Sequence, residues 1–265
     1  MCLLVVLHRV VPGAALVVGA NRDEQLARPA RALAVLRPSR PRVLGGLDEQ
    51  AGGSWLTVND AGVFVGLTNQ PDGRPPDPER PSRGALPVAG GTARSASAAL
   101  ATVVRSAARR HPNPCEVLLG DRTSLYWAAV RPRRPLRAAA LGPGLVVLGN
   151  APLGRSSAKT DRVRRSAAAL VGQPLEIVLA GLGRLLADHE SPAGHGRGQA
   201  PGSRGACCVH EDGYGTRSSH LVVVPERPDE PPRLWVADGP PCQVPFEAVD
   251  APWAEPATTA AREAQ

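Results

Sequence analysis

The chain has 265 residues, of which 43% are hydrophobic, and it carries a formal net charge of +7 with a pI near 9.9. This length is enough for one substantial domain with a hydrophobic core. The basic charge does not indicate nucleic-acid binding, because only one of the 31 basic residues is a lysine (Lys159), the arginines are scattered, and no aromatic side chains accompany them to stack on bases.

The sequence gives no sign of secretion or of membrane insertion. The apolar start lacks a charged leader and is interrupted by Arg9, and no run approaches the roughly 20 apolar residues that span a bilayer. Five cysteines, two of them adjacent, do not form the pattern of a disulfide-stapled protein. We therefore expect a cytoplasmic protein without an integral membrane segment.

The first two dozen residues predict a β-hairpin. Two apolar runs, 3–7 and 14–20, flank the turn residues Pro12 and Gly13. Because a hairpin brings its two ends together, Cys2 is expected beside the segment Asn21-Arg22-Asp23-Glu24 that closes the second strand. A thiol, a guanidinium and two carboxylates then meet at one edge of a sheet.

Cys2 acquires a special property if Met1 is removed by an aminopeptidase, which cysteine is small enough to permit. The residue then carries a thiol and a free α-amine, with unperturbed pKa values of about 8.5 and about 7.7 to 8. The amine can accept the thiol proton, so that one residue supplies both nucleophile and base. A nearby arginine stabilises the thiolate.

The next part of the chain predicts a second hairpin. The Pro- and Arg-rich segment 28–42 is expected to be a loop, and residues 52–58 and 63–69 are expected to be strands around the turn 59–62. The returning strand ends at Asn69. The segment 70–82, which is rich in proline and charge, is predicted to be an exposed loop.

The remaining elements alternate between helices and strands. Ser95 is expected to cap a helix over 96–110, which ends before Pro112. Strands follow, and the last of them ends near Asn150. The full set of further predictions is strands at 115–119, 124–130 and 145–148, amphipathic helices at 159–171 and 175–188, a loop at 191–205, and strands at 206–210, 219–224 and 233–236.

This order of elements predicts an α+β protein. Strand pairs, then helices, then strand pairs indicate sheets covered by helices, without the regular βαβ alternation of a doubly wound fold. We expect one domain over residues 1–249 and a frayed tail over 250–265.

Neither a metal site nor a cofactor site is predicted. The six histidines are dispersed, and no Cys or His pair has zinc spacing beside a second pair. His189 and His195 fall in a loop where metal binding would be adventitious. The paired glycines lack the context of a phosphate or dinucleotide loop, and no serine lies in a nucleophile elbow.

The remaining candidates are Cys2 and polar residues at strand ends. Acyl transfer requires a nucleophile, a donor for the developing oxyanion and groups that orient the amine. The residues of these types are Cys2, Arg22, Asp23, Asn69, Asn150 and Arg217. The alternatives are ordinary turn chemistry for the two asparagines and a surface charge for Arg217.

Taken together, the motifs resemble the NRDE family, which includes the transport and Golgi organisation protein 2 homologues. The resemblance covers residues 1 to about 224. It rests on Met1-Cys2, Ala20-Asn21-Arg22-Asp23-Glu24 with Arg28-Pro29, Gly52-Gly53-Ser54-Trp55, Leu67-Thr68-Asn69, Ser82-Arg83-Gly84, Gly149-Asn150 and Gly213-Tyr214-Gly215-Thr216-Arg217.

This family is similar to the N-terminal nucleophile hydrolases, and the resemblance implies their αββα sandwich. It is also similar, more distantly, to the cysteine choloylglycine and penicillin V acylases. The roles this implies are nucleophile and base for Cys2, thiolate support for Arg22, orientation of the amine for Asp23 or Glu24, an oxyanion donor for Asn69, and completion of the pocket for Asn150 and Arg217.

Two functions are compatible with these residues. One is an N-terminal cysteine amidohydrolase or acyltransferase that acts on a small or lipid-like amide, ester or thioester. The other is a non-catalytic carrier that holds haem or another hydrophobic ligand in the same pocket, as roles proposed for the family suggest. A membrane-associated scaffold is a third possibility, with the helix at 159–171 as its only basic amphipathic element.

Overall fold

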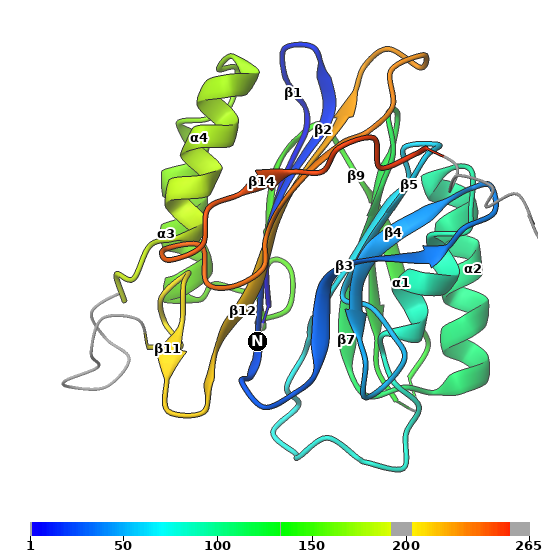
Figure 1. The fold of residues 1–265 in the computed structure, drawn as a ribbon. Coiled ribbons are helices and arrows are strands. Elements are labelled where there is room, and N and C mark those ends of the chain that lie inside the picture. The colour runs from blue at the N-terminus through cyan, green and yellow to red at the C-terminus, as the bar shows by residue number, and fades with distance from the viewer. Residues whose placement is uncertain (1, 133, 192–202, 255–265) are drawn as a thin grey trace, which may run out of the picture.

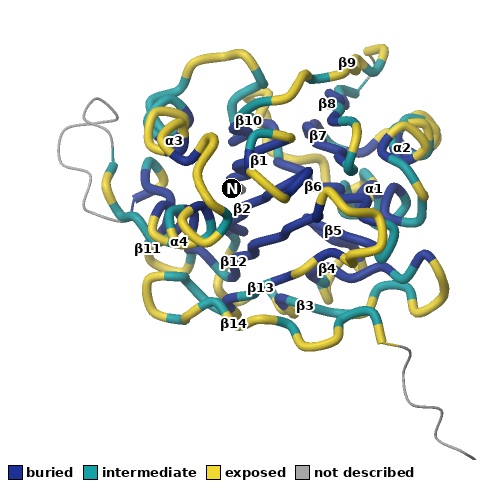
Figure 2. Tube along the Cα trace, turned by 90° about the horizontal axis from the view of Figure 1, so that it is seen from above, coloured by how far each residue is buried: buried dark blue, intermediate teal, exposed yellow. Residues whose placement is uncertain are grey.

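Two seven-stranded antiparallel sheets stack face to face between two layers of helices (Figure 1, Figure 2). This architecture comes from a computed structural model that describes residues 2–132, 134–191 and 203–254, with only the backbone of Cys2. The layers are helix, sheet, sheet and helix. The predicted α+β class and αββα sandwich are confirmed.

The first sheet is built around the N-terminal hairpin. Its strand order is β10-β1-β2-β12-β13-β14, with β11 beside β12. The predicted hairpin is confirmed, since β1 and β2 pair with Cys2 opposite Arg22. The strands are β1 (Cys2–Val11), β2 (Ala14–Gln25), β10 (Gly144–Leu148), β11 (His210–Glu211), β12 (Tyr214–Pro225), β13 (Arg233–Ala237) and β14 (Glu247–Ala248).

The second sheet is a meander in which each strand pairs with the next along the chain. The predicted second hairpin is confirmed, and Gly62 in its turn has a φ of +86°, which favours glycine. The strands are β3 (Ala30–Arg37), β4 (Val43–Asp48), β5 (Leu56–Asn59), β6 (Phe64–Asn69), β7 (Cys115–Gly120), β8 (Leu125–Val130) and β9 (Arg137–Leu141).

The segment 28–42 is not the loop that its composition predicts, because Ala30–Arg37 forms strand β3. The prolines of the segment, at 29, 38 and 41, lie outside the strand, and its two arginines are tolerated because the strand lies at the edge of its sheet. Its partner β4 contains Gly46, and a Cβ there would lie 1.9 Å from the ring of Trp55. Glycine in β4 therefore makes room for an aromatic side chain near the end of the cleft described below.

Each sheet is covered on its outer face by two helices (Figure 2). Helices α1 (Ala85–Gly90) and α2 (Ala96–Arg110) cover the second sheet, and α3 (Ala158–Ala168) and α4 (Leu175–Leu186) cover the first. The predicted α2 is confirmed together with its cap: the Ser95 hydroxyl accepts the amide N–H of Ala98 at 3.2 Å. Helix α1 was not predicted, because its six residues include a proline and a glycine.

The segment 206–210 is not a strand over the predicted range, since only His210 and Glu211 pair with β12. The residues before them are buried and form other backbone contacts. The amide of Cys208 donates to the carbonyl of Asp188 at 2.9 Å, and Val209 exchanges hydrogen bonds with Thr216. The apolar run 206–209 is therefore a buried connecting segment and not a paired β-strand.

Three apolar clusters hold the layers together. One contains residues such as Val5 and Leu182 between α3, α4 and the first sheet; a second contains Val18 and Phe64 between the sheets; a third lies under α1 and α2. Burial is therefore continuous through the sandwich (Figure 2). This rigid core fixes the strand ends at which the candidate site lies.

Part of the predicted tail is described. Trp253 packs against the core between the sheets, and its indole N–H donates to the carbonyl of Pro232 at 2.7 Å. Residues 255–265 lie outside the described residues, so the boundary at 249 stays a prediction. Within the described residues, no helix is both long enough and apolar enough to cross a membrane.

Candidate active site

Two neighbouring cavities, of about 560 and 940 Å³, open where the sheets end beside the loop 70–82. Arg22, Asp23 and Asn69 line the smaller cavity, and Asn69 and Asn150 line the larger one. The two cavities share their lining at Asn69, Pro76, Asp77, Arg80, Arg83 and Asn113. They form one cleft, and the loop predicted to be exposed forms part of its wall.

Arg22 is held rigidly between the two sheets. Its side chain is 4% exposed, its guanidinium carbon lies 4.3 Å from the centroid of the Trp55 ring, and its Nη2 lies 3.4 Å from Oδ2 of Asp48. Asp48 also accepts a hydrogen bond from Nε of Arg28 at 2.8 Å. A buried guanidinium fixed by an aromatic face and a carboxylate is a preorganised positive charge.

Asp23 points to the opposite face of β2, because neighbouring residues of a strand alternate in direction. Its Oδ1 accepts the Thr216 hydroxyl at 2.7 Å, and its Oδ2 lies 3.7 Å from Nζ of Lys159 on α3. The Asp23 side chain is fully buried and that of Lys159 is 12% exposed. Arg22 and Asp23 therefore place opposite charges on the two faces of one strand.

Glu24, the alternative to Asp23, is in a different environment. It also lines the smaller cavity, but it is only partly buried, and its Oε1 accepts the amide N–H of Gln25 at 2.9 Å. Of the two carboxylates, Asp23 is the more deeply buried, and it lies beside the Lys159 ammonium. That Asp23 or Glu24 orients the α-amine of Cys2 stays a prediction.

Cys2 is placed by its backbone alone. It begins β1 and pairs with Arg22, so its Cα lies at the end of the hairpin beside the cleft. Its side chain, like Met1, lies outside the part of the chain that the structure describes. The predicted role of its thiol and amine therefore stays a prediction.

The two predicted asparagines lie together. The side-chain amide of Asn150 donates to the backbone carbonyl of Asn69 at 2.7 Å. Gln70, the next residue, donates to the carbonyl of Gly149 at 3.0 Å, which ties the same two segments a second time. The Asn69 side chain has no hydrogen-bond partner among the described residues, so its amide is available to a ligand in the cleft.

Arg217 is less central than the other candidates. It lies at a β-bulge in β12, between Thr216 and Ser218, and it lines neither cavity. Its Nε is buried and has no hydrogen-bond partner among the residues described. The bulge shifts the register at the position where β12 passes Asp23.

The larger cavity has an excess of positive charge. Its acidic lining residues are Asp72 and Asp77. Its basic lining residues are Arg74, Arg80, Arg83, Arg131, Arg134 and Arg204. Three of these arginines form ion pairs, Arg80 with Asp77, Arg131 with Glu116 and Arg204 with Glu211, and the arginines still outnumber the acidic residues when these partners are included. Arginine presents a planar fork of donors that matches carboxylate, sulfonate or phosphate groups, so this part of the cleft favours an anionic ligand.

Two buried titratable groups are unsuited to acid–base chemistry at neutral pH. Burial raises the pKa of the Cys115 thiol to about 12, which leaves it protonated. Burial lowers the pKa of His220 to about 4, so its ring is neutral while its Nε2 donates to the carbonyl of Ala32 at 2.7 Å. Neither group competes with Cys2 as a nucleophile or as a base.

Sequence reasoning did not identify Lys159 or Asp48 as parts of the site. Both act on the predicted residues from distant segments, Lys159 on Asp23 and Asp48 on Arg22. The composition contains one signal, since a lone lysine among 30 arginines is unusual. A lysine in the first turn of a helix also opposes the helix dipole, which suggests a local reason for its presence.

A comparison with protein-family models gives a match to Transport and Golgi organisation 2 over residues 1–229. The chain belongs to this family. The resemblance inferred from the motifs is thus confirmed, and the family match includes every candidate residue of the cleft. A search of curated protein sequences gives no significant match.

Solved structures share the fold of this Transport and Golgi organisation 2 family member. A Caenorhabditis elegans N-acylethanolamine-hydrolyzing acid amidase ortholog aligns with a TM-score of 0.52 and 11% identity, covering 86% of this chain and 94% of the other. A mutant conjugated bile acid hydrolase from Clostridium perfringens aligns with a TM-score of 0.53 and 8% identity, covering 94% and 96%. At such identities the likeness establishes a hydrolase-like fold and nothing finer.

Proposed function

We propose that the chain is an N-terminal cysteine amidohydrolase or acyltransferase that acts on a small or lipid-like amide, ester or thioester bearing an anionic group. The observation that carries the proposal is the β1–β2 hairpin, which places Cys2 opposite Arg22 at the edge of a cleft lined by Arg22, Asp23 and Asn69. Loss of Met1 is required, because the mechanism uses the free α-amine of Cys2.

The first half of the reaction forms a thioester. The α-amine takes the proton of the Cys2 thiol, the sulfur attacks the acyl carbonyl, and the leaving amine, alcohol or thiol departs with that proton. The Asn69 amide donates to the developing oxyanion, and Asn150 positions Asn69 through its backbone carbonyl. Arg22 stabilises the thiolate, and Asp23, held by Thr216 and Lys159, orients the protonated amine.

The second half releases the acyl group. Water, in hydrolysis, or an acceptor amine, alcohol or thiol, in transfer, gives a proton to the α-amine and attacks the thioester carbonyl. The Cys2 thiol leaves with a proton, which restores the starting state. The arginines of the larger cavity bind an anionic part of the substrate away from the reacting carbonyl.

Covalent labelling tests the proposal. Intact mass spectrometry of the purified protein reports whether Met1 is absent, and incubation with an acyl β-lactone probe should then add one acyl group. We expect no acylation of Cys2→Ala and about a hundredfold to a thousandfold slower acylation of Asn69→Ala. Undiminished labelling of Cys2→Ala would reject the assignment of the nucleophile.

A matched arginine pair tests the anionic substrate. Arg134 lines the larger cavity, whereas Arg137, on β9, does not. With probes that end in a carboxylate, Arg134→Ala should raise the half-saturating concentration several-fold, and Arg137→Ala should not. With an uncharged probe, neither variant should differ from the wild type, and a loss that is equal for both probes would contradict charge recognition.

A carrier for haem or a similar ligand is the second candidate, and the size and arginine lining of the larger cavity favour it. Tyr214 lines this cavity and has an oxygen that can ligate iron. A haem titration tests this function. A Soret shift that saturates at one equivalent of haem and is lost in Tyr214→Phe would support a haem carrier. The absence of a shift at micromolar protein would reject it.

A further inference from the structure

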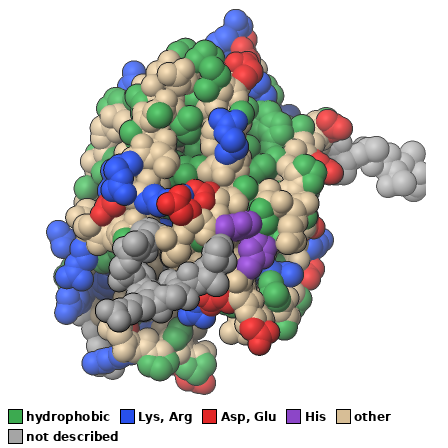
Figure 3. Space-filling view, turned by 90° about the vertical axis from the view of Figure 1, so that its left-hand side faces the viewer, with side chains coloured by type: hydrophobic (Ala, Val, Ile, Leu, Met, Phe, Trp, Pro, Cys, Tyr) green, Lys and Arg blue, Asp and Glu red, His purple; other side chains and the backbone are tan. Residues whose placement is uncertain are grey.

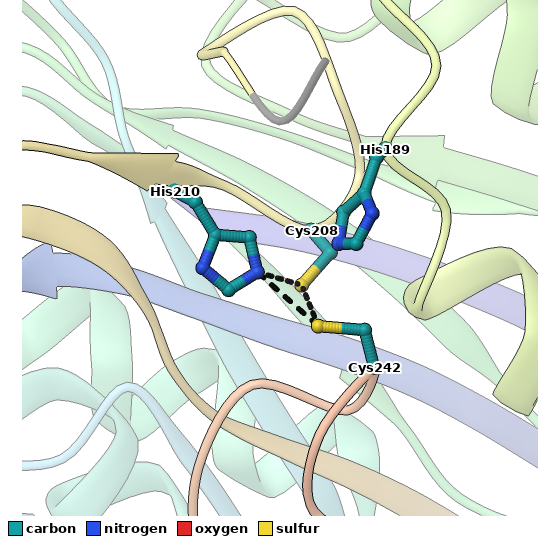
Figure 4. Close-up of side chains that lie close together, drawn as sticks. All are labelled: His189, Cys208, His210 and Cys242. Atoms are coloured by element: carbon teal, nitrogen blue, oxygen red, sulfur yellow. Dashed lines mark hydrogen bonds between the residues drawn. The ribbon is translucent and has the colours of Figure 1, made fainter.

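Four side chains that can ligate a metal meet beside the first sheet (Figure 4), and none of them lines either cavity of the cleft. They are His189, Cys208, His210 and Cys242, and their ligand atoms all lie within 4.8 Å of one another. Figure 3 views the molecule from the side of α3 and α4 and shows histidine side chains together at its surface. We propose that these four residues form a structural Zn²⁺ site.

The distances within the cluster fit tetrahedral zinc. With Zn–S bonds near 2.3 Å and Zn–N bonds near 2.0–2.1 Å, a tetrahedron separates two sulfurs by about 3.8 Å and a sulfur from a nitrogen by about 3.6 Å. The two Sγ atoms, of Cys208 and Cys242, lie 3.6 Å apart, and Nε2 of His210 lies 3.5 Å from the first and 3.2 Å from the second. Three ligands thus already have the spacing of one tetrahedral face.

His189 supplies the fourth position. Its ring centroid lies 5.1 Å from that of His210, in an edge-on arrangement, and its Nε2 is buried without a hydrogen-bond partner among the described residues. A buried imidazole nitrogen without a partner is costly unless a ligand satisfies it. Its ligand nitrogen lies within 4.8 Å of the ligand atoms of the other three residues.

The backbone holds the ligands in place from separate segments. The amide of Cys208 donates to the carbonyl of Asp188, which keeps His189 beside Cys208. His210 is in β11, which pairs with β12, and Cys242 comes from the segment between β13 and β14. A metal here joins the end of α4, the β11–β12 hairpin and the C-terminal segment.

The chemistry of the ligands selects the ion and its role. Thiolate together with imidazole suits Zn²⁺, and four protein ligands leave no open position for a substrate. Binding releases two thiol protons, one from each cysteine, so the two thiolates balance the charge of the ion and the site is neutral. The geometry indicates a structural role rather than a catalytic one.

The site also supports the cleft through a short chain of contacts. Val209, between two of the ligands, exchanges hydrogen bonds with Thr216, at 2.9 Å in each direction. The Thr216 hydroxyl donates to Asp23. Zinc that fixes the backbone at Cys208 and His210 therefore also fixes a contact of a candidate active-site carboxylate.

Metal analysis of the full chain tests the proposal. Protein purified with a thiol reductant and without added metal should contain one zinc per chain by elemental analysis. Cys208→Ser and Cys242→Ser should each lose most of it, whereas Cys207→Ala should retain it, because that neighbouring thiol packs in the apolar core. Cobalt substitution should give the intense visible bands of tetrahedral Co²⁺ and a thiolate charge-transfer band, all absent from Cys242→Ser.

Thermal unfolding of the wild type provides a second test, which does not depend on how well the variants fold. Zinc removed from the wild type by a chelator should lower its Tm, and restored zinc should recover it, whereas the Tm of Cys242→Ser should respond to neither treatment. Several results would overturn the proposal: reduced protein that binds no zinc after reconstitution, zinc retained by both cysteine variants, or a mass two hydrogens lower from a Cys208–Cys242 disulfide in protein kept under reductant.

Discussion

A buried asparagine links each sheet to the helix layer that covers it: Asn59 in the second sheet and Asn21 in the first. The surroundings of these two residues differ. On the second sheet, the Asn59 amide donates to the carbonyls of Gly91 and Ala93, and its Oδ1 accepts two backbone amides of its own turn. On the first sheet, the Asn21 amide donates to the carbonyls of Leu186 and Cys207, and its Oδ1 accepts the Ser219 hydroxyl.

The surroundings differ in charge. The contacts that join α1 to the second sheet are neutral hydrogen bonds, such as the Thr57 hydroxyl to the carbonyl of Pro87 at 3.0 Å. Beneath α3, by contrast, the ion pair of Asp23 and Lys159 is buried in the sheet–helix interface. Helix α1 is thus joined to its sheet by neutral contacts, whereas α3 brings a charge to the candidate site residue Asp23.

The largest expected effect comes from breaking that ion pair. Asp23→Ala leaves the ammonium of Lys159 enclosed without its carboxylate and should lower the free energy of unfolding by about 3 kcal/mol. Urea denaturation measures the loss. The double variant Asp23→Ala with Lys159→Met should recover part of it, and strictly additive losses would show that the two charges are not coupled.

The two asparagines sharpen the comparison. Asn21→Ala and Asn59→Ala each leave several buried groups without their hydrogen-bond partner. Each substitution should therefore lower the free energy of unfolding, measured by urea denaturation, by about 2 kcal/mol. Only Asn21→Ala, two residues from Asp23, should also slow acylation of Cys2 in the labelling assay. Equal labelling rates in the two variants would mean that the helix layer over the first sheet does not support the cleft.

Acid should affect the two helix layers unequally. Burial alone would raise the pKa of Asp121, but backbone amides, including that of Ala96 at the start of α2, hold it below its usual value. Its stabilisation is complete above the unfolded pKa near 3.9 and is lost as the pH falls through the lower folded value. Asp121→Asn should cost about 1.5 kcal/mol at pH 7 and weaken the acid dependence of unfolding.

Asp161, near the start of α3, is the matched control. Hydrogen bonds from Ser156 and Arg164 lower its pKa as well, but its carboxylate is exposed to solvent. Asp161→Asn should therefore change the same pH series less than Asp121→Asn does. The reverse order would contradict the assignment of the acid-sensitive contact to α2.

The smallest effects are expected at the helix caps. Ser95 accepts the amide of Ala98 at the start of α2, and Ser157 accepts the amide of Thr160 at the start of α3, both at 3.2 Å. Replacement of either serine by alanine should cost about 1 kcal/mol. Because Ser157 precedes Lys159, only Ser157→Ala should shift the pH profile of Cys2 acylation; a shift in both variants would indicate a general loosening.

The sequence predicted those parts of the fold that are encoded locally. The two hairpins and helix α2 have clear periodicity and clear boundary residues, such as Gly62 and Ser95. Strand β3 was missed because the prolines that flank it and the arginines around them are typical of a loop, and the strand lies at the sheet edge, where such a setting is acceptable. Helix α1 is too short for periodicity to be visible.

The candidate site divides in the same way. Arg22, Asp23, Asn69 and Asn150 lie at or just after the ends of predicted strands, so that their meeting at one end of the sandwich was predictable. The contact of Lys159 with Asp23 and the cysteine–histidine cluster join segments far apart in the chain. Such contacts depend on how the layers pack, and no spacing in the sequence encodes them.

The single lysine of this chain has a practical consequence for spectroscopy. Reductive methylation with isotope-labelled formaldehyde modifies amines, so Lys159 is the one side chain in the sequence that would carry the label. Its dimethylamino resonance would report directly on the Asp23 carboxylate beside it. Ligand binding in the cleft would then be followed by NMR at this one side-chain resonance.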